Sequence, residues 1–277
     1  SSLGTGRTAL LVDVDSDGDG TFDHIESYPG NPIRSIACDA GEYGRYLCVD
    51  APIGKYSPSS SAMYATDASA GYYVPTTGQS TQTACLAGTY NPNTGSTTST
   101  DCLDADAGYF VNQIAQSNQI ECELGTYQPL TGQSSCDDTD AGYYVDQMAQ
   151  TNQTGCGLGT YQPLTGQSSC NAADAGSYVD QMAQTNQTEC GLGTYQPSTG
   201  QSSCDDADAG HYVDQIAQTN QTECKLGTYQ SFTAQSSCLE ADAGYYVDQV
   251  AQTNQTECGL GTYQSFTAQS SCLEADA

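Results

Sequence analysis

The sequence predicts a small, disulfide-rich β fold: an elongated, solenoid-like rod of tandem 34-residue repeats, each made of two 17-residue halves, with little helix. Three observations support this fold class. The cysteines follow a fixed spacing, because from Cys122 onward the gaps alternate between 14 and 20 residues. A Gly-x-Tyr motif recurs every 17 residues from Gly125 to Gly261. The chain has no Trp, four Phe and three Met against 20 Tyr and 29 Gly, so it lacks the residues of a broad core.

The 17-residue period extends upstream of the regular repeats. Gly54, Gly71 and Gly88 keep the same step, three extra residues precede Gly108, and Gly41 opens a shortened unit, which gives 14 half-repeats. Gly, Thr, Ser and Gln fill each unit, which excludes the helical tetratricopeptide repeat of the same length. We therefore expect an N-terminal segment at 1–36, atypical cysteine-rich repeats at 37–105, and regular repeats at 106–277. The last repeat stops halfway and there is no initiator Met, so we expect a processed or cut chain.

Two kinds of half-repeat alternate. In a stapled half such as CGLGTYQPLTGQSSC (156–170), one cysteine lies three residues before the Gly and another eleven residues after it. In the unstapled half AADAGSYVDQMAQTNQ (172–187), those places hold Ala173 and Gln187. This favours closure of each stapled half on itself; the rival register pairs across the 20-residue gap, as in Cys170–Cys190. The favoured pairs are Cys38–Cys48, Cys85–Cys102, Cys122–Cys136, Cys156–Cys170, Cys190–Cys204, Cys224–Cys238 and Cys258–Cys272.

Disulfides indicate a compartment outside the cytosol, and each closed loop contributes roughly 3 kcal/mol on the chain-entropy model. A zinc site is disfavoured, because the only histidines are His24 and His211 and no Cys-x-x-Cys occurs. Disorder is the alternative suggested by the Gln, Thr, Ser and acidic content; the strict periods argue against it. We expect Gly159 and its equivalents to lie where the backbone turns or packs closely, and GTYQP and GYYVDQ to form short strands. We also expect Tyr161 and Tyr178 each to lay a ring over a neighbouring staple.

The segment CGLGTYQPLTGQSSC resembles the ephrin-receptor-like and tumour-necrosis-factor-receptor-like cysteine-rich repeats. In those families Cys-x-x-Gly-x-Tyr begins a short irregular β unit that a cysteine about 14 residues later closes. The resemblance covers roughly residues 38–277. It implies a ladder of small β modules and an extracellular location, and the chain departs from it where alternate halves lack their cysteines.

Charge and composition exclude several classes of function. The chain carries 33 acidic and five basic residues, a formal net charge of −28, which should repel nucleic acid and anionic membranes. No apolar run approaches the roughly 20 residues of a membrane span. No catalytic constellation is evident, and near-identical repeats do not supply the unique residues that an active site needs. We therefore expect that the chain is not an enzyme.

The N-terminal segment predicts a calcium site. DSDGDGTFDHIE (15–26) places oxygen ligands at alternate positions around a turn glycine, which is the pattern of a calcium loop. TALLVDV (8–14) precedes it as a predicted strand and YPGNP (28–32) follows it, so the helices of an EF-hand are not expected. The alternative is a solvated acidic turn. The expected ligands of a structural Ca²⁺ are Asp15, Asp17, Asp19, Thr21, Asp23 and Glu26.

Asn-Gln-Thr recurs in one phase of the 34-residue repeat, and outside the cell it is an acceptor for an N-linked glycan. Recent duplication is the alternative explanation. Asn118 is followed by Ile120 where Thr is required, so this copy is not expected to be modified. The predicted glycosylation sites are Asn152, Asn186, Asn220 and Asn254. The same halves repeat DAGxYVD, whose carboxylates, such as Asp140 and Asp146, either share a cation or form a solvated acidic face.

Together these features predict a secreted structural protein of the cell surface, calcium-bound and glycosylated, that acts as a stalk or as the subunit of an extracellular filament. The predicted strand at 8–14 would add to a neighbouring copy, which gives head-to-tail self-association. It could instead pair within a larger N-terminal domain. The alternative function is a receptor or adhesin ectodomain that binds a surface ligand, a protein or a glycan, of unknown identity.

Overall fold

The computed structural model describes residues 37–44 and 47–275, which form two compact units. Residues 37–44, 47–84 and 93–101 belong to the first unit, and residues 85–92 and 102–275 to the second. In the first unit the hairpins are β1 (Glu42–Tyr43) with β2 (Val49–Asp50), β3 (Lys55–Tyr56) with β4 (Thr66–Asp67), and β5 (Tyr72–Tyr73) with β6 (Thr83–Ala84).

The second unit contains eleven further antiparallel hairpins within its described residues. They are β7 (Thr89–Tyr90) with β8 (Leu103–Asp104), β9 (Tyr109–Phe110) with β10 (Ile120–Glu121), β11 (Thr126–Tyr127) with β12 (Asp137–Asp138), β13 (Tyr143–Tyr144) with β14 (Thr154–Gly155), β15 (Thr160–Tyr161) with β16 (Asn171–Ala172), β17 (Ser177–Tyr178) with β18 (Thr188–Glu189), β19 (Thr194–Tyr195) with β20 (Asp205–Asp206), β21 (His211–Tyr212) with β22 (Thr222–Glu223), β23 (Thr228–Tyr229) with β24 (Leu239–Glu240), β25 (Tyr245–Tyr246) with β26 (Thr256–Glu257), and β27 (Thr262–Tyr263) with β28 (Leu273–Glu274).

Each half-repeat of the sequence is therefore one hairpin, and the predicted class of a small, disulfide-rich, nearly helix-free β fold is confirmed. The first strand begins directly after the motif glycine, and the second follows the closing Cys or Gln. In β11–β12, for example, Tyr127 pairs with Asp137. Both strands are only two residues long, shorter than the segments GTYQP and GYYVDQ suggested, and such a hairpin is not stable by itself.

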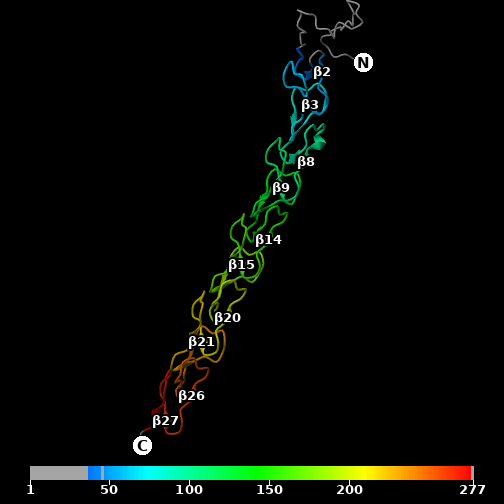
Figure 1. Cartoon of the computed structure of the whole chain (residues 1–277). Helices are drawn as coiled ribbons and strands as arrows, with labels where there is room; N and C mark the ends of the chain where they lie inside the picture. The colour runs from blue at the N-terminus through cyan, green and yellow to red at the C-terminus, as the bar shows by residue number, and fades with distance from the viewer. Residues whose placement is uncertain (1–36, 45–46, 276–277) are drawn as a thin grey trace, which may run out of the picture. The chain divides into compact units, whose positions relative to one another are not determined.

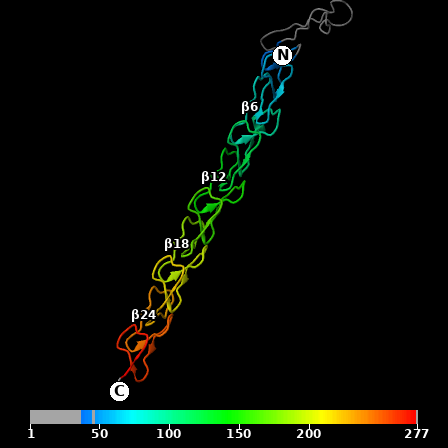
Figure 2. The ribbon, with the colours of Figure 1, turned by 60° about the vertical axis from the view of Figure 1, so that its left-hand side comes forward.

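Stacking supplies the missing stability within the second unit. The same three backbone hydrogen bonds join each half to the next: Gly125 donates to Val145, Gln128 donates to Gln150, and Ala149 donates back to Cys122, at 2.8–3.0 Å between nitrogen and oxygen. In this unit the hairpins follow one another in chain order (Figures 1 and 2). Each hairpin thus satisfies its backbone groups through its neighbours, as in repeat proteins generally.

The motif glycines are required for this stacking. Gly159 has a φ of +77°, in the left-handed region that L side chains rarely adopt. A Cβ on Gly159 would also overlap the carbonyl of Gly200, which belongs to the half-repeat two positions further along. The expectation that these glycines lie at turns and close approaches holds for both reasons. Each half therefore contacts the next but one as well as the next, which we did not expect from the sequence.

The core is a thin column of small side chains. The first cysteine of each of the stapled halves at 85, 122, 156, 190 and 224 is at most 1% exposed, and unstapled halves place Ala or Thr at the same position, as at Thr139 and Ala173. Three residues after the glycine, the unstapled halves from Gly71 onward bury a valine, such as Val145, and the stapled halves from Cys122 onward bury a glutamine, such as Gln162. The Gln162 amide is satisfied within its own hairpin, since it donates to Ser169 O and accepts from Leu164 N. Tyr161 and Tyr144 are only half-buried beside this column.

The three extra residues before Gly108 form the 3₁₀ helix η1 (Ser99–Asp101). The Asp101 carboxylate accepts the backbone N–H groups of Thr97 and Thr98 at 2.8 and 2.9 Å. Both hydrogen bonds lower the pKa of Asp101 below its usual 3.8, and the bond from Thr98 has the larger effect. The insertion is therefore closed by its own side chain and leaves the stacking pattern unchanged.

Candidate functional site

The structure pairs all 14 cysteines in the register that closes each stapled half on itself. The Cα atoms of the pairs are 5.4–5.8 Å apart, and no free cysteine remains. The rival Cys170–Cys190 pair is not formed. The first cysteine of each disulfide lies in the core column, and the second lies at the end of the hairpin loop, just before the second strand. The bridge thus restricts the unfolded chain locally, within one half-repeat.

The unstapled halves are closed by a side-chain clamp in place of the disulfide. In the half at 173–187, Gln187 Oε1 accepts the backbone N–H of Asp174 at 2.6 Å, and Gln187 Nε2 donates to Asp174 Oδ2 at 2.7 Å. This Gln stands at the position of the second cysteine, and the Asp follows the position of the first. The full set of clamps is Asp106–Gln119, Asp140–Gln153, Asp174–Gln187, Asp208–Gln221 and Asp242–Gln255, with distances of 2.6–2.7 Å.

Two halves of the first unit depart from this clamp. Gln82 accepts the backbone N–H of Ser69 at 2.7 Å and donates to its hydroxyl at 3.4 Å. The half-repeat that begins at Gly54 has neither a cysteine pair nor this glutamine, and there Lys55 forms a 2.8 Å salt bridge with Asp67 across the β3–β4 pair. Both partners of this ion pair are exposed, so it contributes less than about 1 kcal/mol.

The clamp gives the acidic residues of the unstapled halves a specific role. The Asp140 carboxylate holds Gln153, whereas Asp146, its expected partner in a cation site, lines a surface groove beside Tyr144. Within residues 37–44 and 47–275 no three or more Asp, Glu, His or Cys side chains are grouped so as to hold a metal ion. The predicted calcium ligands, Asp15 to Glu26, and the predicted strand at 8–14 lie outside the described residues.

The four sequon asparagines occupy equivalent, exposed positions. Each lies two residues before the second strand of its hairpin, and its side-chain nitrogen donates only to the preceding Thr hydroxyl, at 3.2–3.4 Å. Gln187 is engaged in the clamp. Thr188 begins β18, but Ile120 begins the equivalent strand β10, so this place does not need a Thr side chain. Asn186 contributes nothing comparable to the hairpin. Glycosylation at these positions stays a prediction.

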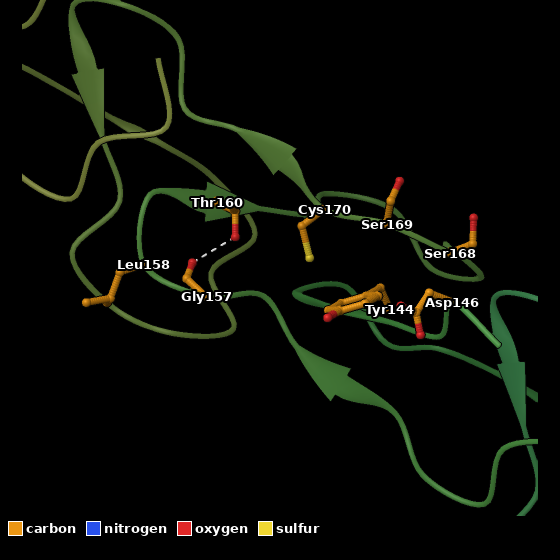
Figure 3. A pocket seen from close by; sticks show the side chains of 8 residues that line it. All are labelled: Tyr144, Asp146, Gly157, Leu158, Thr160, Ser168, Ser169 and Cys170. Atoms are coloured by element: carbon orange, nitrogen blue, oxygen red, sulfur yellow. Dashed lines mark hydrogen bonds between the residues drawn. The ribbon is translucent and has the colours of Figure 1, made fainter. Parts of the chain in front are cut away.

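Two equivalent grooves lie where an unstapled half meets the next stapled half. The first, about 410 Å³, is lined by Tyr144 and Asp146 on one side and by Ser168, Ser169 and Cys170 on the other (Figure 3). The second, about 440 Å³, repeats these residue types 34 residues later with Tyr178, Asp180, Ser202, Ser203 and Cys204. In these two grooves the Tyr of the unstapled half thus lies beside a disulfide cysteine of the following half, in line with the expectation for Tyr178.

Two tyrosines of stapled halves have pKa values that are shifted upward. Burial raises the pKa of Tyr127 and of Tyr195 above the usual 10.0. The carboxylates of Asp140 and Asp137 add to this effect at Tyr127, and Asp208 and Asp205 at Tyr195. Each ring therefore remains neutral to higher pH than a free tyrosine.

Sequence reasoning missed the clamp and the second strand of every hairpin. One feature of the sequence does indicate the clamp: Gln119 is kept in the copy where Ile120 replaces the Thr of the sequon that begins at Asn118. A residue retained without its sequon has a role independent of glycosylation. The second strand left no such signal, because segments such as Asn171–Ala172 are exposed, polar and only two residues long.

Comparison with models of known protein families gives no match, and no curated protein is significantly similar to the chain. The resemblance to ephrin-receptor-like repeats therefore stays a prediction. Among the described residues no helix is long and apolar enough to cross a membrane. Tandem β hairpins with seven disulfides are consistent with an extracellular structural protein or ectodomain.

Proposed function

We propose that the chain is an extracellular structural repeat protein, not an enzyme, that serves as a surface stalk or as the subunit of an extracellular filament. The observation that carries this proposal is the uniformity of the second unit. Its half-repeats are joined by the same backbone hydrogen bonds from one to the next, and each is closed by a disulfide or by a Gln–Asp clamp. Such a stack has the same construction all along its length, which suits a protein that spans distance.

The predicted partner in a filament is a second copy of the chain, joined through residues 8–14. Electron microscopy of the native protein and of a variant lacking residues 1–14 tests this. We expect filaments from the complete chain and isolated particles from the variant. Filaments of normal length from the variant would remove the strand from the joint, whereas isolated particles in both samples would favour the stalk over the filament.

Glycosylation and calcium belong to the same proposal. Glycans on Asn152, Asn186, Asn220 and Asn254 would cover a thin stack whose backbone is close to solvent, and all four side chains are exposed. Mass spectrometry that finds four unmodified asparagines in the secreted protein would contradict this. Chelation of calcium should increase proteolysis within residues 8–30 and leave the stapled repeats intact; equal resistance with and without chelator would count against the site.

The alternative function, a receptor or adhesin ectodomain, is favoured by one observation, the repeated surface groove. A high-affinity complex with one soluble partner, with no filament and no surface attachment, would support that alternative over the structural one.

A further inference from the structure

The two grooves combine three kinds of group in a fixed arrangement. Tyr144 provides an aromatic face, Asp146 a carboxylate on the same side, and Thr160, Ser168 and Ser169 provide hydroxyl oxygens. Figure 3 shows Ser168 and Ser169 on the segment that runs opposite Tyr144 and Asp146. The groove at Tyr178 has the same set and a second carboxylate, that of Glu189. No Lys, Arg or His lines either groove.

We propose that these grooves bind the lysine side chains of a basic polypeptide. A lysine has an apolar four-carbon stem and an ammonium head with three N–H donors and no acceptor. The Tyr ring can cover the stem or face the cation, the carboxylate neutralises the charge, and the Thr160 hydroxyl oxygen can accept one of the N–H donors. The net charge of −28 attracts such a polypeptide over longer distances.

Charge complementarity decides between this ligand and a neutral sugar. A sugar would also use a ring and a carboxylate, but it carries no positive charge to pair with the exposed carboxylates of Asp180 and Glu189 in one groove. The recurrence of the groove favours a polypeptide over a single small cation. The sequence repeats the Tyr-x-Asp, Leu-Gly-Thr and Ser-Ser-Cys elements at Tyr246 and Asp248, so a basic segment whose lysines match the spacing of the copies can engage more than one of them and bind by avidity.

One copy of the repeat provides an internal comparison. Where the grooves at Tyr144 and Tyr178 have Gly157 and Gly191, the copy at Tyr212 has Lys225. A lysine of the chain itself at the edge of the groove should compete with a lysine of the partner. The Lys225→Gly variant should therefore bind the partner more strongly than the wild-type chain.

The experiment measures fluorescence anisotropy of a labelled hexalysine peptide with the complete, disulfide-bonded chain at about 0.15 M salt, where long-range attraction is screened. A ring variant keeps the net charge and replaces three groove tyrosines. An acid variant neutralises three groove carboxylates, and a control variant neutralises three acidic residues that line neither of the two grooves. The three variants are Y144L/Y178L/Y246L, D146N/D180N/D248N and D137N/D205N/E274Q. Circular dichroism and disulfide mapping check that each is folded.

We expect the ring variant to bind hexalysine about two- to fivefold more weakly for each groove that the peptide engages, and the acid variant to lose more affinity than the control variant. Equal affinity of the ring variant and wild type, with equal losses in the other two, would show only diffuse attraction to an acidic chain and overturn the proposal. No binding of hexalysine would overturn it as well. Ring-dependent binding of free spermine or of a neutral oligosaccharide, as tight as that of hexalysine, would reassign the groove to that ligand.

Discussion

The Gln–Asp clamp gives the sharpest test of how the unstapled halves are held. Replacing Gln187 by Leu keeps the volume of the side chain and removes both of its hydrogen bonds to Asp174, of 2.6 and 2.7 Å. One of these bonds goes to a carboxylate, but Asp174 is exposed and Gln187 is half-buried. The stabilising free energy of each bond should therefore lie toward the lower end of the range for its type. Two such bonds together contribute about 2 kcal/mol.

That loss should appear locally, because the disulfides at Cys156–Cys170 and Cys190–Cys204 still close the halves on either side. The backbone N–H of Asp174 is the direct reporter, since Gln187 is its hydrogen-bond acceptor. If this half opens without global unfolding, about 2 kcal/mol accelerates amide exchange at Asp174 about 30-fold. Hydrogen exchange followed by mass spectrometry on non-reduced protein measures this.

Two control variants separate the clamp from its surroundings. Asn186→Gln removes the sequon and keeps the clamp, whereas Gln187→Leu keeps an Asn-x-Thr sequon and removes the clamp. Gln181→Leu changes an exposed glutamine whose one side-chain hydrogen bond is a 3.3 Å contact with Gln184. Neither control should alter exchange at Asp174. Equal exchange in Gln187→Leu and Gln181→Leu would refute the assignment of the clamp as the noncovalent equivalent of the disulfide.

Three further predictions concern the same repeats. Gly159→Ala should destabilise the fold by about 2 kcal/mol or more in urea denaturation, because φ is +77° and the new Cβ meets a carbonyl. Ala183→Gly, at a φ of +57°, should be neutral or stabilise the fold by up to about 1 kcal/mol. A stable Gly159→Ala variant together with a destabilised Ala183→Gly variant would contradict the stacking geometry. Ala173→Cys with Gln187→Cys should form an eighth disulfide, detected by non-reduced peptide mapping, whose contribution of about 3 kcal/mol exceeds that of the clamp it replaces. The folded-state pKa of Tyr195 is raised, so its stabilising effect is present below pH 10.0 and is lost as the pH rises through that raised pKa; Tyr195→Phe should weaken this loss in denaturation curves at alkaline pH.

The spacing of cysteines and glycines in the sequence was sufficient to predict the disulfide register and the number of hairpins. The 14- and 20-residue gaps, with Ala173 and Gln187 standing where cysteines are absent, favoured the disulfide register that the structure contains. The 17-residue step of the glycines gave the number of hairpins, because only Gly tolerates both the positive φ and the close carbonyl at Gly159. Both features depend on strict local chemistry, and a short repeat displays them many times.

The polar contacts were harder to predict because they depend on how a loop returns to its start. Asp140 and Asp146 are six residues apart in sequence, so they were the natural pair to consider, whereas the partner of Asp140 is Gln153, thirteen residues away across the hairpin. Only the pairing of β13 with β14 brings that glutamine back to the beginning of the hairpin. The groove at Tyr144 was missed for a related reason, since it is lined by two consecutive halves whose contact is made by stacking.

The Asn-Gln-Thr motif combines residues that are retained for different reasons. Gln closes the hairpin in all five copies from Gln119 to Gln255, and the following residue begins the second strand, where Thr and Ile are both accepted. The copy at Asn118 therefore keeps everything that the fold needs and loses only the sequon. Packing and hydrogen bonding do not require Asn or Thr in the other four copies, because both side chains are exposed there. What the fold leaves unexplained in this motif is the pair of residues that a glycan requires, and the proposed modification of those four positions would account for that pair where recent duplication is the alternative.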